Sequence, residues 1–196
     1  MNTTIRPRFP APKTTSSPAV RTFRWLSGLG LLAVVAYLFL NATDFRTAEA
    51  QILATWLNPL INGGVKPTAT YFLVTLPGSQ LIAFNITMEC TALLLVAPLA
   101  VLSALMLMFT QVGSLRTICA LTASSTATFA INQSRLGLIA WTTQTWGMDF
   151  GYVIGHRFIG SLIALAGFAL GFLILLWITL KPTRRSNARR SAEHRG

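Results

Sequence analysis

Three residues of this chain have side chains that could together carry out acyl transfer: Cys90, Arg135 and His156. A thiol can act as a nucleophile, an imidazole can carry protons, and a guanidinium can stabilise a developing oxyanion. Taken singly, a cysteine or a histidine at the end of an apolar helix is usually inert, whereas an arginine inside a membrane segment suggests function by default. The question is therefore whether the elements of the chain bring the three together.

The composition is that of a membrane protein. Of the 196 residues, 53% are hydrophobic and only 11% are charged, with a mean hydropathy of +0.57, whereas soluble domains have roughly 25% charged residues. The net charge of +11 comes from basic residues that flank apolar runs. This distribution is typical of the positive-inside rule and argues against a nucleic-acid partner. The two cysteines are too few for a disulfide framework, and we expect neither a metal nor a cofactor.

Four apolar runs predict four membrane spans, at about 25–41, 89–109, 117–141 and 154–180. They form a membrane domain over 25–180, between a disordered basic tail at 1–24 and a basic tail at 181–196. Five basic residues lie in the first tail, one in the loop after the second span and six in the last tail. The charge rule therefore places both termini in the cytoplasm and the loop at 142–152 outside the cell membrane.

The first span has a second interpretation as a signal peptide, because Ala48-Glu49-Ala50 resembles a cleavage site. Ten residues separate that site from the apolar run, so an uncleaved anchor is favoured.

Residues 42–88 are expected to form a small outer cap. Apolar residues recur at helical spacing between Ile52 and Leu60, which predicts a short amphipathic helix at the interface. The runs 71–76 and 81–87 are rich in β-branched and aromatic residues and flank Pro77-Gly78, which suggests two extended segments. A broken, half-inserted helix is the alternative. The predicted fold class is all-α: a multi-pass membrane helical bundle with a cap that includes short extended segments.

This topology places the three reactive side chains at one depth. Cys90 opens the second span and His156 opens the fourth, both at the outer boundary. Arg135 lies about 18 residues into the third span, or roughly 27 Å from its cytoplasmic end at ~1.5 Å per residue. Cys119 begins that span, so a disulfide between Cys90 and Cys119 is excluded.

Two further residues are candidates for supporting roles. Ser125, Thr128, Asn132 and Arg135 form a polar stripe, which should face the bundle rather than lipid. Asn132 lies one turn from Arg135 and could orient it. Glu89 could tune the thiol, contact the substrate or cap the helix. In the fourth span, Gly151/Gly155 and Gly167/Gly171 allow close helix approach.

The chain resembles the exosortase/archaeosortase family of membrane-embedded cysteine transpeptidases. The matching residues are Gly78 with the run 81–87 that leads into Glu89-Cys90-Thr91, then Asn132-Gln133-Ser134-Arg135, and finally Gly155-His156. The similarity covers residues 70–175, about half of the chain. A glycine usually follows the Cys-Thr pair in that family, and here the residue is Ala92.

The resemblance implies catalytic roles for Cys90, Arg135 and His156. It also implies a substrate class: exported proteins that end in a short motif, a hydrophobic span and a basic cluster. Cleavage would proceed through a thioester, with transfer to a membrane lipid or another acceptor, or with hydrolysis by water. The segment 71–87 could pair with an extended substrate by β-addition. The alternative is a non-catalytic membrane assembly or transporter subunit, in which Arg135 and Glu89 are structural.

Overall fold

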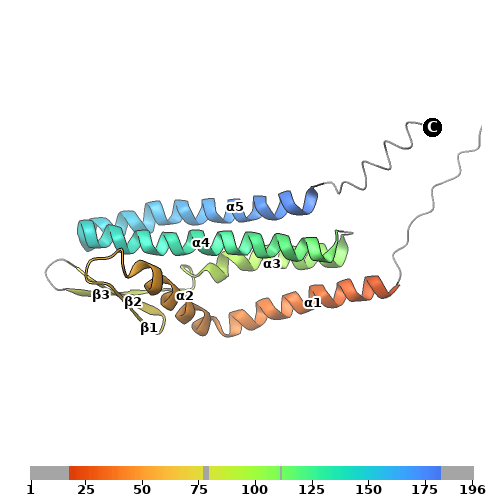
Figure 1. Ribbon diagram of the computed structural model, residues 1–196, viewed down its shortest axis with the longest axis horizontal. Helices are drawn as coiled ribbons and strands as arrows, with labels where there is room; N and C mark the ends of the chain where they lie inside the picture. Colours follow the sequence, from red (N-terminus) through yellow and green to blue (C-terminus); the bar gives the residue numbers. More distant parts are fainter. Residues whose placement is uncertain (1–17, 77–79, 111, 182–196) are drawn as a thin grey trace, which may run out of the picture.

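The computed structural model describes residues 18–76, 80–110 and 112–181 of the chain. Four α-helices and one π-helix form an elongated bundle, and a fifth α-helix and three strands form a cap at one of its ends (Figure 1). In chain order the elements are α1 (Pro18–Leu40), α2 (Ala42–Leu57), β1 (Val65–Thr68), β2 (Tyr71–Thr75), β3 (Leu81–Asn85), α3 (Ala92–Phe109), α4 (Ser114–Trp146), the π-helix η1 (Gly147–Ile159) and α5 (Gly160–Leu180). The predicted helical bundle with a small cap is confirmed.

Three helical runs in the described part of the chain are long and apolar enough to cross a membrane: 18–40, 92–109 and 114–180. The third run folds back on itself, so that α4 and α5 lie side by side and antiparallel (Figure 1). The reversal occurs at Gly147, which has a φ of 80° that favours glycine. The bundle therefore consists of α1, α3, α4, η1 and α5, and the start of α1 and the end of α5 lie opposite the cap (Figure 1).

The predicted outer loop at 142–152 is wrong, because α4 continues to Trp146 and η1 follows at once. The polar side chains of residues 142–145 have hydrogen-bond partners within the helix or in the cap. Thr142, Thr143 and Thr145 donate hydrogen bonds to carbonyls three or four residues earlier. Gln144 instead donates to the carbonyls of Asn62 and Thr75, at 2.7 and 2.8 Å, and so fixes the cap to the top of α4.

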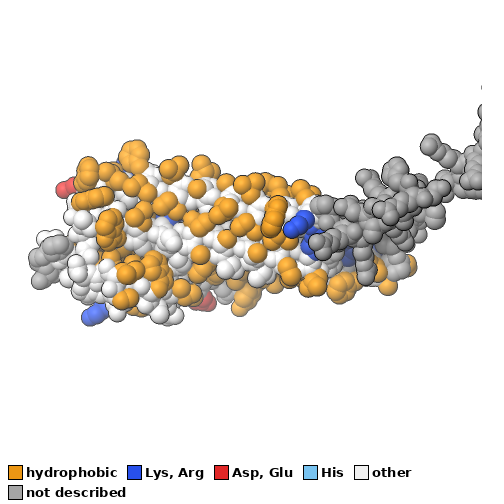
Figure 2. Space-filling view, turned by 45° about the horizontal axis from the view of Figure 1, so that its top comes forward, with side chains coloured by type: hydrophobic (Ala, Val, Ile, Leu, Met, Phe, Trp, Pro, Cys, Tyr) orange, Lys and Arg blue, Asp and Glu red, His pale blue; other side chains and the backbone are white. Residues whose placement is uncertain are grey.

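Glycines allow close packing between α4 and the two helices that run antiparallel to it, η1 and α5. A Cβ atom added at Gly155 would collide with Thr142, and one added at Gly171 would collide with Thr128. At Gly167 the added atom would lie 2.7 Å from a methyl group of Ile131. The predicted close approach at these glycines is confirmed. The bundle's outer surface is apolar, and Figure 2 shows hydrophobic side chains spread along its visible face.

The cap is a three-stranded antiparallel sheet in the order β1-β2-β3, with α2 packed against it. Leu53 and Leu57 of α2 share a buried core with Phe72, Val74 and other residues of the sheet. The extended segments are thus confirmed and the half-inserted helix is excluded for the described residues, while Pro77-Gly78 lies outside them.

Three predicted boundaries need correction. Residues 18–24, expected in a disordered tail, already belong to α1, whose first residue is a proline, a residue well tolerated in a first helical turn. The remainder of both predicted tails, 1–17 and 182–196, lies outside the described residues. The cap helix begins at Ala42 rather than Ile52. The second spanning helix begins at Ala92 rather than Glu89, because Thr91 caps it by accepting a hydrogen bond from the Leu93 N–H.

Candidate active site

Cys90 lies in a tight turn between the sheet and the bundle. The turn follows β3 and is closed by a hydrogen bond of 3.0 Å from the Cys90 N–H to the Thr87 carbonyl. Thr91 and α3 follow immediately. The side chain is only 5% exposed, so the thiol is held at the base of the cap rather than on the outer surface.

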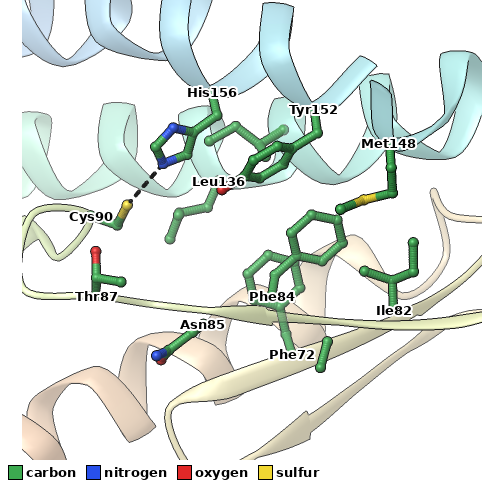
Figure 3. Close-up of a pocket in the computed structure, with 12 residues that line it drawn as sticks. Phe72, Ile82, Phe84, Asn85, Thr87, Cys90, Leu136, Met148, Tyr152 and His156 are labelled. Atoms are coloured by element: carbon green, nitrogen blue, oxygen red, sulfur yellow. Dashed lines mark hydrogen bonds between the residues drawn. The ribbon is translucent and has the colours of Figure 1, made fainter. Parts of the chain in front are cut away.

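The structure brings the three sequence-predicted residues together. Cys90 Sγ lies 3.5 Å from His156 Nε2 (Figure 3) and 4.0 Å from Arg135 Nη2. His156 comes from η1 and Arg135 from α4, so three separate elements converge on the sulfur. An imidazole at this distance can exchange a proton with the thiol, and the guanidinium lies within reach of an oxyanion that forms beside the sulfur.

Asn132 and Arg135 form the buried end of the polar stripe on α4. Asn132 is fully buried and donates a hydrogen bond of 3.0 Å to the Cys90 carbonyl. Arg135 is 6% exposed, and its Nε has no hydrogen-bond partner among the described residues. Thr128 is also buried, whereas Ser125 is only half-buried. Asn132 therefore contacts the backbone of the cysteine, and the guanidinium keeps donor capacity for another group.

A residue that the sequence analysis did not select, Glu49, is at the centre of this arrangement. It lies in α2 and is 1% exposed. Its carboxylate accepts a short hydrogen bond from the Thr91 hydroxyl, one of 2.9 Å from the Ala92 N–H and one of 3.4 Å from Asn132 Nδ2. One side chain thus connects α2, the start of α3 and α4.

The environment of Glu49 shifts its protonation equilibrium. Burial raises the pKa of the Glu49 carboxyl above its ordinary value, and the hydrogen bonds from Thr91, Ala92 and Asn132 oppose that rise, as does the charge of Arg46. A signal in the sequence could have indicated this site. Glu49, Leu53 and Leu57 follow one another at steps of four, so the carboxylate lies on the apolar face of the helix.

Glu89, which the sequence predicted as a supporting residue, is not part of the hydrogen-bonded arrangement around Glu49. Its side chain is exposed on the turn beside Cys90 and makes no hydrogen bond with the described residues. It does not open the helix, since α3 begins three residues later. A role for Glu89 in tuning the thiol or contacting the substrate stays a prediction.

A row of aromatic rings leads from the sheet to the imidazole. Phe72 and Phe84 stack at 5.1 Å between ring centroids, Tyr152 lies 6.1 Å from Phe84, and the rings of Tyr152 and His156 stack at 5.2 Å with an interplanar angle of 23°. Figure 3 shows these rings together beside Cys90. The stacking orients His156 toward the sulfur.

The outer edge of β3 is unpaired among the described residues, since the sheet order ends there. The Leu76 N–H donates to the Gln80 carbonyl and the Ile86 N–H to the Thr70 carbonyl. In an antiparallel pair such bonds alternate, so the main-chain groups of Ala83 and Asn85 point away from β2. Both residues also line a pocket that contains Cys90.

Comparison with known families gives one match. The family model described as transmembrane exosortase (Exosortase_EpsH) matches residues 64–177. The match begins just before β1 and contains Cys90, Arg135 and His156, whereas α2 with Glu49 precedes it. Neither the search of curated proteins nor that of solved structures found a match.

Proposed function

The chain belongs to the transmembrane exosortase family, and we propose that it is a membrane cysteine transpeptidase with Cys90, Arg135 and His156 as its catalytic groups. The observation that carries the proposal is the position of the Cys90 sulfur, 3.5 Å from His156 Nε2 and 4.0 Å from Arg135 Nη2. A nucleophile with a proton carrier and an anion stabiliser in reach is the arrangement that acyl transfer requires.

In the proposed reaction His156 takes the thiol proton, and the Cys90 thiolate attacks the scissile carbonyl carbon. The guanidinium of Arg135 stabilises the tetrahedral oxyanion. When the carbon–nitrogen bond breaks, His156 gives its proton to the leaving amine and a thioester remains. An acceptor amine, hydroxyl or water then attacks the thioester and loses its proton to His156, and Cys90 leaves as a thiolate. Asn132 holds the Cys90 main chain during both steps.

The proposed substrates are exported proteins with a C-terminal motif, a hydrophobic span and a basic cluster. The apolar outer surface of the bundle suits a neighbouring transmembrane segment. A substrate strand added to the free edge of β3 would be guided toward Cys90, which lies five residues beyond Asn85. With both termini in the cytoplasm, the site would face the outside of the cell membrane.

The test is processing of a co-expressed protein that carries such a signal. We expect Cys90→Ala to lose at least about 10³-fold in rate, and Arg135→Ala to lose about 10²–10³-fold. His156→Ala should lose about 10²–10⁴-fold. Cys119→Ser and Arg157→Ala are matched controls, since the first removes an exposed thiol and the second an exposed arginine next to His156. Processing by Cys90→Ala at the wild-type rate would disprove the catalytic proposal and favour a structural subunit.

The proposed orientation has its own test. Cys119 lies 16 residues before Arg135 on α4, or about 24 Å at ~1.5 Å per residue. A small thiol reagent that does not cross membranes should label Cys90 in intact cells and label Cys119 only after permeabilisation. The reverse pattern would overturn the orientation while leaving the catalytic proposal standing.

A further inference from the structure

A pocket of about 270 Å³ lies between the sheet and the helices α4 and η1, with the Cys90 sulfur in its wall. Cys90 and His156 lie at one end, and Met148 and Ile82 lie at the other (Figure 3). Its volume is just under the range of roughly 300–1,000 Å³ that small-molecule sites occupy. The space suits one or two side chains of an extended polypeptide.

The lining of this pocket is apolar. Rings and aliphatic chains supply most of the wall: Phe72, Ile82, Phe84, Leu136, Ile139 and Met148. None of the described lining residues is an aspartate, glutamate, lysine or arginine. At the end lined by Met148 and Ile82, away from His156, a charged substrate side chain would lose its hydration without gaining a charged partner, which is strongly unfavourable. An aliphatic or aromatic side chain would instead leave water for an apolar wall.

The sheet explains how such a side chain would reach the pocket. Alternate residues of a strand point to opposite faces of a sheet. Ile82 and Phe84 of β3 point to the pocket face, and the main-chain groups of Ala83 and Asn85 point to the free edge. A substrate strand hydrogen-bonded at that edge would therefore direct every second side chain into the pocket.

We propose that this pocket is a specificity subsite that takes an uncharged apolar side chain of the substrate, close to the scissile bond, and that the substrate residues on either side of it point away. The substrate's identity as an exported protein rests on the function proposed above. The selectivity of the pocket does not, because it follows from the pocket's lining and can be measured on Cys90 without any processing.

The test uses two iodoacetamide probes that differ by one carboxylate group, N-phenethyl-iodoacetamide and its para-carboxylate analogue, on the full chain in detergent micelles. Mass spectrometry gives the alkylation rate of Cys90, and exposed Cys119 in the same molecule serves as the internal reference for probe reactivity and partitioning. We expect the Cys90/Cys119 rate ratio to be about tenfold or more higher for the phenyl probe. Equal ratios for the two probes would overturn the proposal.

Two matched variants locate the effect. Met148 lines the pocket and is 43% exposed, so Met148→Asp should fold and should abolish the preference for the phenyl probe. Phe150, two residues later, is 60% exposed and does not line the pocket, so Phe150→Asp should keep the preference. An equal loss in both variants would contradict the assignment. Selective labelling in a protein that processes no substrate would refute the proposed function while supporting the pocket.

Discussion

Replacement of Glu49 by alanine would test whether one buried carboxylate holds the cap to the bundle. The change removes the acceptor of three donors: the Thr91 hydroxyl, the Ala92 N–H and Asn132 Nδ2. A buried donor left without a partner costs about 1–3 kcal/mol. Thr91 and Asn132 keep their other contacts, to the Leu93 N–H and the Cys90 carbonyl, so their losses should be partial. The Ala92 N–H keeps no hydrogen-bond partner among the residues that the structure describes.

Removal of Glu49 also ends the cost of burying a carboxyl group, which offsets part of the loss. We therefore expect Glu49→Ala to lower the free energy of unfolding by about 2–4 kcal/mol. For a chain of this length that corresponds to roughly 5–15 °C in Tm. Glu49→Gln keeps the size and one acceptor oxygen, and should cost only about 1 kcal/mol.

The assay is thermal unfolding in detergent, followed by tryptophan fluorescence, with Cys90 alkylation measured in parallel. Glu49→Ala should increase the alkylation rate of Cys90 relative to Cys119, because the turn before α3 loses its anchor. Asp44→Ala on the same helix and Glu89→Ala beside Cys90 remove exposed carboxylates and should leave Tm unchanged. If Glu49→Ala unfolds at the same temperature as Asp44→Ala, the carboxylate is not an anchor and the reasoning fails.

Three further results are expected. Because burial raises the pKa of Glu49, the folded state holds a proton at pH values where the unfolded state has released it, so the free energy of unfolding should fall as the pH rises from 4.5 through the folded-state pKa. The Tm–pH profile of Glu49→Gln should lack this fall. Identical profiles for the variant and the wild type would refute the prediction. Gly171→Leu should lower the free energy of unfolding by about 1–3 kcal/mol or more, because its Cβ would collide with Thr128. Gly30→Leu is the control in the same melting assay, since a Cβ at Gly30 meets nothing within 4 Å. Glu89→Gln should leave stability within about 0.5 kcal/mol of wild type; a shift in the pH profile of processing would show that Glu89 tunes the thiol.

The convergence of Cys90, Arg135 and His156 could be predicted because it depends on two regular quantities. The charge rule orients the spans, and the constant rise of a helix then fixes the depth of each residue. The two strands were likewise predictable from their β-branched and aromatic content. These features depend on local composition and on the regular geometry of a helix, so they can be predicted from the sequence.

The features that sequence reasoning missed depend on contacts between distant segments. Glu49 is a partner of the site only because α2 packs against the start of α3. Its spacing from Leu53 and Leu57 indicates that the carboxylate is buried, but not which segment it contacts. Residues 142–146 were predicted to lie in a loop, yet Gln144 bonds to the cap and the threonines bond to their own helix. Whether a polar side chain marks a loop or stabilises a helix end is decided by such partners.

The short junction between α1 and α2 has a consequence for exchanging parts between members of this family. α1 ends at Leu40 and α2 starts at Ala42, so the first membrane helix runs almost directly into the helix that bears Glu49. The family match, 64–177, begins after both. A chimera that transplants only the matched region onto a foreign N-terminal half would lose the Glu49 carboxylate that binds the Thr91 hydroxyl and the Ala92 N–H. The smallest transferable unit is therefore residues 42–180, with the cap helix inherited along with the cysteine.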